Sequence, residues 1–534
     1  MMDYLLTHAP ALIIAVPLLG AFLTPLISRI NDKLRNIFVI LTLGLTTFLV
    51  FLLANDVFTN GIRTYVFGHA GDITLPIVRI LFEIDGLNAF MAIIGCLLPL
   101  IAVIYSWSFI KENTGLDKYY TLILLMTAGM LGMMLTGDMF NFFVFLEITS
   151  ISSAALVAFW TNKGKASVAA FKYIVISAIG ALFVLFAVAI LYGQYNALNM
   201  AVLANNMSYS FLDKIALVLL IAALAMKSGI VPMHMWLPDA YGRAPSSISI
   251  ILIGTTQASL YGVLRVCFTL YGSNLTTQIN QIGELLISPA VLIAILLIVL
   301  ALATILVGVL MALKQTDLKR MIGYAAVAEI GFMVLAIGAA ISTFQTNAQT
   351  GITTMSTTGM VALKGGIFHI INDALDIGLL FLVAGAIYYA TKETSLNKLG
   401  GLARNMKYTT VLFLIGLFAV SGMPPMNGFA SKLLIYESTY QINPILSIVA
   451  ILSSILLLAV FVKVFHSVFL GPQQSSFKKV KEVPISMLIA MGAIACIIII
   501  FGIFPDLIIT NIVNPAAQAL ASNTPYITSV LGGI

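Results

Sequence analysis

The sequence predicts an all-α polytopic membrane protein with about 14 transmembrane helices. Hydrophobic residues make up 60% of its 534 residues, charged residues make up only 9%, and the mean hydropathy is +1.06. Soluble globular domains carry roughly 25% charged residues, so most of this surface must face something other than water. Apolar stretches recur at the length of a membrane span, and basic residues gather in alternate loops between them.

The apolar stretches give the predicted spans in order. A helix needs about 20 apolar residues to cross the hydrocarbon of a bilayer. By this length the spans lie near residues 10–28, 36–55, 84–109, 119–137, 139–160, 168–192, 213–233, 246–271, 287–312, 319–342, 361–389, 408–438, 444–470 and 485–511. The longest gap, 56–83, contains turn-forming and β-branched residues and predicts a short surface hairpin. The first residues lack the basic region of a cleaved signal peptide, so the first stretch is expected to be a retained span.

The distribution of lysine and arginine predicts the orientation of the spans. Basic residues mark the cytoplasmic loops of membrane proteins. Nineteen of them fall in one set of alternate loops: Arg29, Lys33, Arg35, Lys111, Lys118, Lys163, Lys165, Lys172, Arg243, Lys314, Lys319, Arg320, Lys392, Lys398, Arg404, Lys407, Lys478, Lys479 and Lys481. The opposite loops hold Arg63, Arg79 and Lys214. We therefore expect a protein of the cytoplasmic membrane with both termini outside the cytoplasm, and the net charge of +6 needs no nucleic-acid partner to explain it.

The sequence lacks the motifs that hold common cofactors. Its three cysteines, Cys96, Cys267 and Cys496, each lie in an apolar stretch, without a second cysteine or a histidine at metal-binding spacing. No glycine-rich loop for a nucleotide and no nucleophile–base set is visible. A stand-alone enzyme is therefore disfavoured. We predict no cofactor in this chain and expect any redox cofactor in partner subunits.

Ionisable residues lie inside the predicted spans. A charge at the bilayer centre costs about 2.5–3.5 kcal/mol on insertion scales, so such residues are rare and usually functional. Together they predict a protein-lined, partly hydrated interior through which an ion moves. The residues are Lys227, Arg265, Lys364, Lys432, Lys463, Glu147, Glu329, Glu437, Asp373, Asp376, His369 and His466.

Glu147 and Lys227 form the first candidate pair. Glu147 lies among aromatic residues in the fifth span, and Lys227 lies in the seventh. Burial disfavours the charged form of a lysine, whereas a nearby carboxylate favours it. A movable carboxylate could therefore load and unload a proton on Lys227. The alternative is a static ion pair that pins two helices together.

Two spans contain helix breakers beside a lysine. Gly229 and Pro232 interrupt the seventh span, next to Lys227. The twelfth span, which carries Lys432, is interrupted by Gly422, Pro424, Pro425 and Gly428. Broken helices at membrane depth are tolerated where backbone lines a cavity, and pairs of them in two halves of a transporter indicate its site.

The position of these breaks predicts two halves related by inversion. Two spans before each lysine lies a glutamate, Glu147 in one half and Glu329 in the other. We predict four regions: N-terminal helices 1–3 in residues 1–110, a first five-helix repeat in 111–272, a second in 285–471, and a fourteenth helix with a tail in 484–534.

The eleventh span carries a second candidate relay. His369 and Asp373 are four residues apart and share a helix face. Histidine is the usual proton shuttle and a neighbouring acid tunes it, so a relay is the prediction, with a purely structural histidine as the alternative. Asp376 either extends the relay or holds a neighbouring helix.

The remaining candidates lie nearer the ends of the spans. Lys463 and His466 share a face of the thirteenth span. They mark an exit of the ion path, or Lys463 simply extends toward the membrane surface. Glu437 is expected near the outer end of the twelfth span. Arg265 is expected to contact helix ends rather than ions.

Four motifs resemble one family of membrane proteins. They are Phe-Asn-Phe-Phe-Val-Phe-Leu-Glu at 140–147, Lys-Ser-Gly-Ile-Val-Pro-Met-His-Met-Trp-Leu-Pro-Asp-Ala at 227–240, Asp-Leu-Lys-Arg-Met-Ile-Gly-Tyr at 317–324 and Asn-Gly-Phe-Ala-Ser-Lys at 427–432. The chain resembles, over nearly its whole length, the antiporter-like subunits of respiratory complex I, the D-type subunits of Mrp sodium/proton antiporters and the antiporter-like subunits of membrane-bound hydrogenases. The resemblance implies fourteen helices with two inverted five-helix repeats.

The resemblance also implies a proton path. It would run from a Glu–Lys pair through a middle lysine or histidine to an exit lysine. These roles would be carried by Glu147, Lys227, His369 and Lys432, with His234 of the second motif as a secondary candidate.

Four positions in three spans depart from the family pattern. Gln257 stands at the usual lysine position of the eighth span, and Asp373 and Ile377 replace a histidine and a lysine of the eleventh. Glu329 occupies a position of the tenth span where the family commonly has glutamine. Because acids replace cations in the second half, this half either binds a cation, with sodium near Asp373, or uses a second switch between Glu329 and Lys432.

The sequence therefore predicts a proton-translocating, or sodium-translocating, antiporter-like subunit of an energy-converting complex. Its expected partners are other membrane subunits, the transported ions and the lipid bilayer. The substituted centre favours a hydrogenase or Mrp relative over a standard complex I subunit. The alternatives are a subunit of an Mrp-type antiporter without a redox partner, and a structural scaffold whose ionisable groups only hold helices together.

Overall fold

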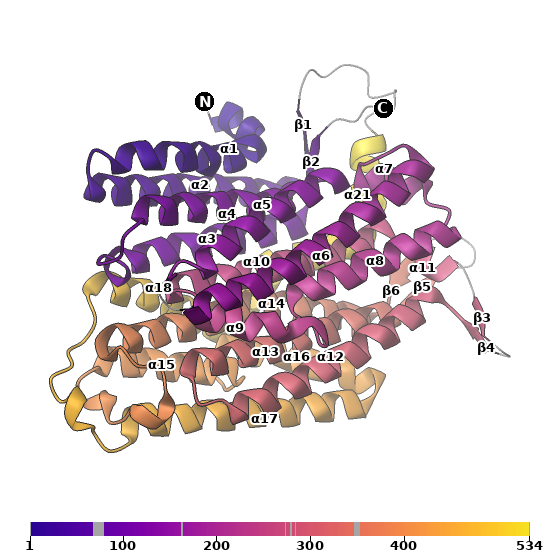
Figure 1. The fold of residues 1–534 in the computed structure, drawn as a ribbon. Helices are drawn as coiled ribbons and strands as arrows, with labels where there is room; N and C mark the ends of the chain where they lie inside the picture. Colours follow the sequence, from indigo (N-terminus) through magenta and orange to yellow (C-terminus); the bar gives the residue numbers. More distant parts are fainter. Residues whose placement is uncertain are drawn as a thin grey trace.

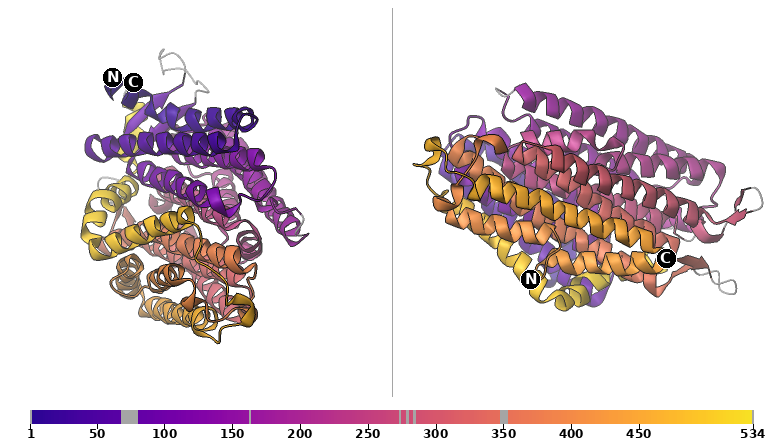
Figure 2. Two further views of the ribbon diagram at one scale, coloured as in Figure 1. Left: turned by 90° about the vertical axis from the view of Figure 1, so that its left-hand side faces the viewer. Right: turned by 90° about the horizontal axis from the view of Figure 1, so that it is seen from below.

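The architecture was obtained as a computed structural model, which describes residues 2–67, 80–161, 164–272, 274–277, 280–282, 285–346 and 353–532. Within these ranges, 13 helices are long and apolar enough to cross a membrane. They run side by side in one bundle, with α1 and α2 on the side opposite α17 (Figures 1 and 2). The predicted all-α polytopic membrane fold is confirmed.

Most spans begin and end within about five residues of their predicted bounds, but α1 begins at Met2 rather than near residue 10. They comprise α1 (Met2–Ser28), α2 (Asp32–Asn60), α3 (Gly86–Phe109), α4 (Leu116–Leu135), α5 (Met139–Val157), α6 (Gly164–Tyr195), α8 (Phe211–Ser228), α10 (Ser246–Leu264), α12 (Pro289–Lys314), α13 (Leu318–Ser342), α14 (Thr357–Thr391), α17 (Pro444–Phe465) and α18 (Ile485–Ile503). The π-helical turns Arg265–Leu270 and His466–Leu470 continue α10 and α17.

The predicted twelfth span accounts for the difference between 14 and 13. It is divided into α15 (Lys407–Val420) and α16 (Asn427–Ile442), each too short to cross the bilayer alone. The seventh span is also broken: α8 is followed by the 3₁₀ turn η1 (Met233–Met235) and by α9 (Trp236–Arg243). Both predicted interruptions are therefore present.

Polar residues at the ends of the spans fix where helices start. Asp138 accepts a hydrogen bond from the Asn141 amide (2.7 Å) at the start of α5. Asp317 does the same for the Arg320 amide (3.1 Å) at the start of α13. These caps satisfy amide groups that have no partner within the helix.

Three helices form the buried centre of the bundle. The most apolar stretches of α10 and α14 are entirely buried and that of α13 is 94% buried, whereas those of α1 and α18 are only 33% buried. The outer helices expose their apolar side chains as lipid-facing helices do, and α10, α13 and α14 are shielded from lipid. Polar side chains on these three helices therefore face other protein groups.

Short hairpins and helices lie at the ends of the bundle. Strands β1 (Arg63–Val66) and β2 (Leu81–Ile84) pair antiparallel, which confirms the predicted hairpin. Sequence reasoning missed two further hairpins and several short helices. These are β3 (Asn280–Ile282) with β4 (Leu285–Ile287), β5 (Phe344–Thr346) with β6 (Thr353–Met355), α7 (Met200–Asn206), α11 (Asn274–Thr277), α20 (Asn514–Ala521) and α21 (Thr524–Leu531).

The last span is shorter than predicted. It ends at Ile503 rather than near 511, and the short helix α19 (Pro505–Ile508) begins at the proline that follows. Proline has no backbone N–H to continue the helical hydrogen bonds. The chain then passes through the π-helical turn Ile509–Val513 and returns along α20 and α21 to the β1–β2 hairpin (Figure 1).

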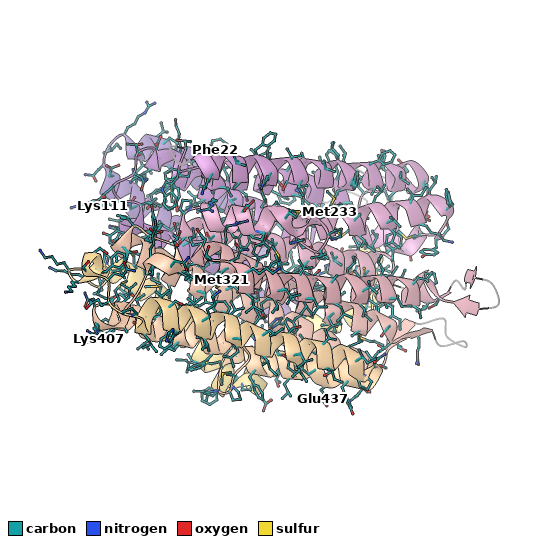
Figure 3. All side chains as sticks on the ribbon, turned by 60° about the horizontal axis from the view of Figure 1, so that its bottom comes forward. Phe22, Lys111, Met233, Met321, Lys407 and Glu437 are labelled. Carbon is teal, nitrogen blue, oxygen red and sulfur yellow. The ribbon has the colours of Figure 1, made fainter. Side chains whose placement is uncertain are left out.

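The basic loops meet at one end of the bundle. Lys111 and Lys407 lie at the end opposite the β-hairpins (Figure 3). The loops there contact one another: the Leu318 amide donates to the Thr394 carbonyl (2.9 Å), and Arg243 pairs with Asp317 (3.3 Å). The alternation of basic loops thus corresponds to two physical ends, although Arg79 and Lys163 lie outside the described residues.

Candidate functional site

A buried cation–carboxylate group lies between α13, α14 and α16. Nζ of Lys432 donates a hydrogen bond to Oε1 of Glu329 (2.8 Å), and Nε2 of His369 lies 2.8 Å from Oε2 of the same carboxylate. All three side chains are at most 1% exposed. A carboxylate held between a lysine and a histidine can transfer a proton to either.

Hydrogen bonds continue from His369 along α16. Nδ1 of His369 is 3.0 Å from Oγ of Ser431, which accepts a hydrogen bond from Nδ2 of Asn372 (2.9 Å). Nδ2 of Asn427 donates to Oδ1 of Asp376 (3.0 Å). Asp376 therefore belongs to the same buried polar layer as His369, and it also ties α14 to α16.

Asp373 pairs with Gln257 rather than with His369. Nε2 of Gln257 donates to Oδ2 of Asp373 (3.1 Å) and to the Ile370 carbonyl (2.8 Å). His369 instead points toward α13, because Glu329 provides a charged partner there. Oδ1 of Asp373 and Oε1 of Gln257 are buried and have no hydrogen-bond partner among the described residues.

Lys227 has a different environment in the first half. Its Nζ donates to Oγ of Ser150 (2.5 Å), and the side chain is 6% exposed. Glu147, one turn before Ser150 on α5, is only partly buried, and no basic nitrogen of a described residue lies within 4.0 Å of its carboxylate. The predicted ion pair between Glu147 and Lys227 is therefore not formed in this structure. The ammonium group of Lys227 is hydrogen-bonded to Ser150 instead.

A small cavity of about 10 Å³, lined mostly by hydroxyl-bearing residues, adjoins Lys227. Its walls come from α4, α5, α6, α8 and α10, and most of its polar atoms are hydroxyl groups. Such a cavity suits water, which needs several hydrogen-bonding partners. The hydroxyl-bearing residues in its walls are Thr149, Ser150, Tyr173, Ser177, Thr255 and Ser259.

The helix breaks bring both lysines to helix C-termini, Lys227 by its position in the chain and Lys432 by its ammonium group. α8 is capped at its C-terminus by Gly229, which has a left-handed backbone conformation (φ +81°). Gly422, which follows α15, also has a left-handed backbone conformation (φ +70°). Lys227 lies in the last turn of α8, and Lys432 reaches across the second break to donate to the Val420 carbonyl at the end of α15 (2.8 Å). The negative end of a helix dipole favours a cation at both places.

The secondary candidates lie apart from this layer. His234 is partly buried beside Tyr324 at the first break, with ring centroids 6.5 Å apart. Lys463 is exposed and donates to the Leu313 carbonyl at the end of α12 (3.0 Å). His466 and Glu437 are exposed. The expectation for Arg265 is met, because it bonds Asp85 (2.5 Å), the N-cap of α3.

Sequence reasoning missed the neutral partners of the lysines and histidine. Ser150 lies three residues after Glu147, and Ser431 directly precedes Lys432 in the motif at 427–432. For Ser150, the spacing of three residues from Glu147, which places both on one helix face, was a usable signal. Among the described residues, no group of three or more His, Cys, Asp and Glu side chains is placed to hold a metal ion.

Several known proteins are similar to this chain over nearly its whole length. The chain is 29% identical over 532 residues to NADH-quinone oxidoreductase subunit N of Desulforudis audaxviator, covering 95% of this chain and 98% of the relative. It is 28% identical over 524 residues to a Na(+)/H(+) antiporter subunit of Bacillus subtilis, covering 97% of this chain and 98% of that relative. It spans only 62% of the length of the matching Na(+)/H(+) antiporter subunits A and A1.

A solved structure shares the fold. A chain of the membrane-bound sulfane sulfur reductase, an archaeal respiratory membrane complex, superposes with a TM-score of 0.83 at 27% identity, covering 98% of this chain and 99% of that one. Residues 136–457, which include Glu147, Lys227, Glu329, His369 and Lys432, match a single family description. The chain belongs to the NADH:quinone oxidoreductase/Mrp antiporter transmembrane family.

Proposed function

We propose that this chain translocates protons as an antiporter-like subunit of a larger membrane complex. The observation that carries the proposal is the Glu329–Lys432–His369 group, three titratable side chains that meet at the Glu329 carboxylate and are each at most 1% exposed. Burying such groups is costly, and a well-packed apolar core of the same volume is often as stable or more stable. A role in transport explains why they are there.

Each half supplies one proton-carrying lysine. The Glu329 carboxylate contacts both Lys432 and His369, so it can accept the proton of Lys432 and pass it to His369. When the carboxylate moves away from Lys432, the charged form of this lysine is no longer stabilised. Lys227, bonded only to a neutral hydroxyl and next to a polar cavity, exchanges protons through water. Gln257 does not titrate, so its hydrogen bond to Asp373 holds that acid near the centre rather than carrying the proton.

Partner subunits contact the face of α5 that carries Glu147. This carboxylate is partly exposed and has no ion pair among the described residues. A neighbouring subunit that draws Glu147 toward or away from Lys227 would change the charge of that lysine. The relatives are named as subunits of quinone oxidoreductase and antiporter complexes, so redox cofactors belong to other subunits in this proposal, and none belongs to this chain.

The placement in the membrane follows from the basic end of the bundle. This end faces the cytoplasm, the complex lies in the cytoplasmic membrane, and both termini lie outside the cytoplasm. Sodium is the second candidate ion, because the free acceptor oxygens of Asp373 and Gln257 would suit a cation.

Lys227→Ala tests the proposal in the assembled complex. We expect normal assembly and loss of coupled proton transport, measured with a pH-sensitive dye in proteoliposomes. Lys214→Ala, on the same helix but partly exposed, serves as the matched control and should transport normally. Normal transport by Lys227→Ala would favour a scaffold. Transport that requires sodium, and loses this requirement in Asp373→Asn, would favour sodium as the ion.

A further inference from the structure

Glu83 is a buried carboxylate outside the membrane spans. It lies on β2, its side chain is 0% exposed, and Oε1 accepts a hydrogen bond from Oγ of Ser529 (2.9 Å). Oε2 is fully buried without a hydrogen-bond partner among the described residues, as is the hydroxyl of Tyr526. No Lys, Arg or His nitrogen of the described chain lies within 4.0 Å of the carboxylate. A buried ionised carboxylate without a cation is costly, so the neutral acid is favoured.

The nearby arginine is already engaged by a different acid. Arg265 pairs with Asp85 at 2.5 Å, and Asp85 also accepts the Leu87 and Asn88 amides at the start of α3. Burial raises the pKa of Glu83 to about 8, although Ser529, Arg265 and Tyr526 oppose this rise. The titratable and charged groups on the elements around Glu83 are Asp85, Arg265, Tyr526, Asp138 and Arg63, of which Arg63 is bound to Asp56.

Polar groups connect this acid to the centre of the bundle. Nε of Arg265 donates to the Tyr261 hydroxyl (3.1 Å), which also accepts from Nδ2 of Asn88 (3.0 Å). Tyr261 lies on α10 one turn after Gln257, which corresponds to about 6 Å along the helix axis. Gln257 in turn donates to Asp373. A line of buried polar groups thus runs along α10 from the central layer to the hairpin end.

The short helix α21 covers Glu83. Tyr526 is the buried residue of this helix, and its ring centroid lies 4.9 Å from the Arg265 guanidinium. Ser529 supplies the hydrogen bond to Glu83. Asn523, just before the helix, donates to the Thr269 carbonyl (3.2 Å). α21 also packs against α7, and it contacts the α10 span through the ring of Tyr526.

We propose that Glu83 is the proton-carrying group of an outlet at the hairpin end of the bundle, with Tyr261, Arg265 and Asp85 leading to it and α21 as its cover. The proposal rests on the proposed function. Displacement of α21 admits water, which accepts the proton of the neutral Glu83 acid, and a proton that reaches the hairpin end then binds the resulting carboxylate and restores the neutral acid. Arg265 stays paired with Asp85 throughout, so Glu83 alone changes charge.

Glu83→Gln tests the outlet in the complete complex. Glutamine retains the acceptor for Ser529 but cannot carry a proton. We expect normal assembly and a fall of at least about tenfold in coupled proton transport, because a positioned proton-transfer group typically contributes roughly a hundredfold. The rate of proton transport by the wild type should change when the pH on the hairpin side passes about 8. The variant should lose this pH dependence. Glu437→Gln, an exposed glutamate on α16, is the matched control and should behave as wild type.

A spectroscopic measurement separates a proton carrier from a structural residue. Difference infrared spectra of the complex should show a protonated carboxylic acid at neutral pH that titrates near pH 8 and is absent in Glu83→Gln. Ser529→Ala removes a hydrogen bond that lowers the pKa of Glu83, so it should shift this titration to higher pH. An ionised Glu83 at neutral pH would overturn the proposal.

The outlet and the proposed function fail in different ways. If Glu83→Gln keeps the wild-type rate and pH profile while Lys227→Ala has lost transport, the outlet is wrong and the proposed function stands. If Lys227→Ala also transports normally, the proposed function itself is wrong.

Discussion

The two buried lysines of this protein are held in opposite ways. Lys432 contacts a carboxylate, a backbone carbonyl and, through Glu329, a histidine, all at hydrogen-bonding distance. Lys227 contacts one hydroxyl, that of Ser150, and adjoins a polar cavity. Both lysines lie beside a helix break that begins with a glycine in the left-handed backbone conformation. Similar local backbone is therefore combined with a charged partner for one lysine and a neutral partner for the other.

This difference indicates how one fold can hold protons with unequal strength. A fully buried carboxylate beside a lysine stabilises its charged form, whereas a hydroxyl does so weakly. Under the proposed function, Lys432 is the lysine that retains its proton, and Lys227, which has no carboxylate contact, is the lysine that releases it until Glu147 approaches. The two halves would then represent different stages of one cycle.

The largest expected effect comes from removing each lysine. Lys432→Ala leaves Glu329 buried without its lysine, and breaking a buried pair in this way typically costs about 3–5 kcal/mol. Lys227→Ala removes a hydrogen bond to a charged group, worth about 1.5–3 kcal/mol, and leaves no charge stranded. Thermal unfolding of the purified complex should therefore show a larger loss for Lys432→Ala. Equal losses would mean that Lys227 has a carboxylate partner in solution.

A smaller effect is expected at the two serines beside the lysines. Ser150→Ala removes the contact of Lys227, so we expect coupled proton transport to fall about fivefold, equivalent to roughly 1 kcal/mol. Ser431→Ala leaves the contacts of Lys432 with Glu329 and Val420 intact and should change transport less. Transport rates in proteoliposomes compare the two variants. A larger effect at Ser431 would place the sensitive step in the second half.

Much of the fold could be predicted because the bilayer constrains it. The length of the apolar stretches predicted the helices, and the alternation of basic loops predicted their orientation. Gly229 and Gly422 indicated the two helix breaks. The short helices α20 and α21 escaped prediction, since each has only eight residues and is too short for a span. The relation of the two halves by inversion remains a prediction.

The charged members of the site and the contact between Glu329 and Lys432 could also be predicted, but not the partner of His369. Intramembrane charge singled out Glu329, His369 and Lys432, because such residues are rare. Helix spacing suggested His369 with Asp373, yet the structure pairs His369 with Glu329 on another helix. Spacing along one helix reports only which residues share a face. Contacts between helices depend on packing, which sequence pattern does not determine.

The most direct test of the central claim is the double variant Glu329→Gln with Lys432→Met. It replaces a buried ion pair by neutral side chains of similar volume, a change that is often neutral or stabilising, so assembly should match wild type. If these groups carry protons, coupled proton transport in proteoliposomes should fall by at least about tenfold, equivalent to roughly 1.4 kcal/mol. Transport at the wild-type rate by the assembled variant would contradict the account and leave the pair as a structural contact.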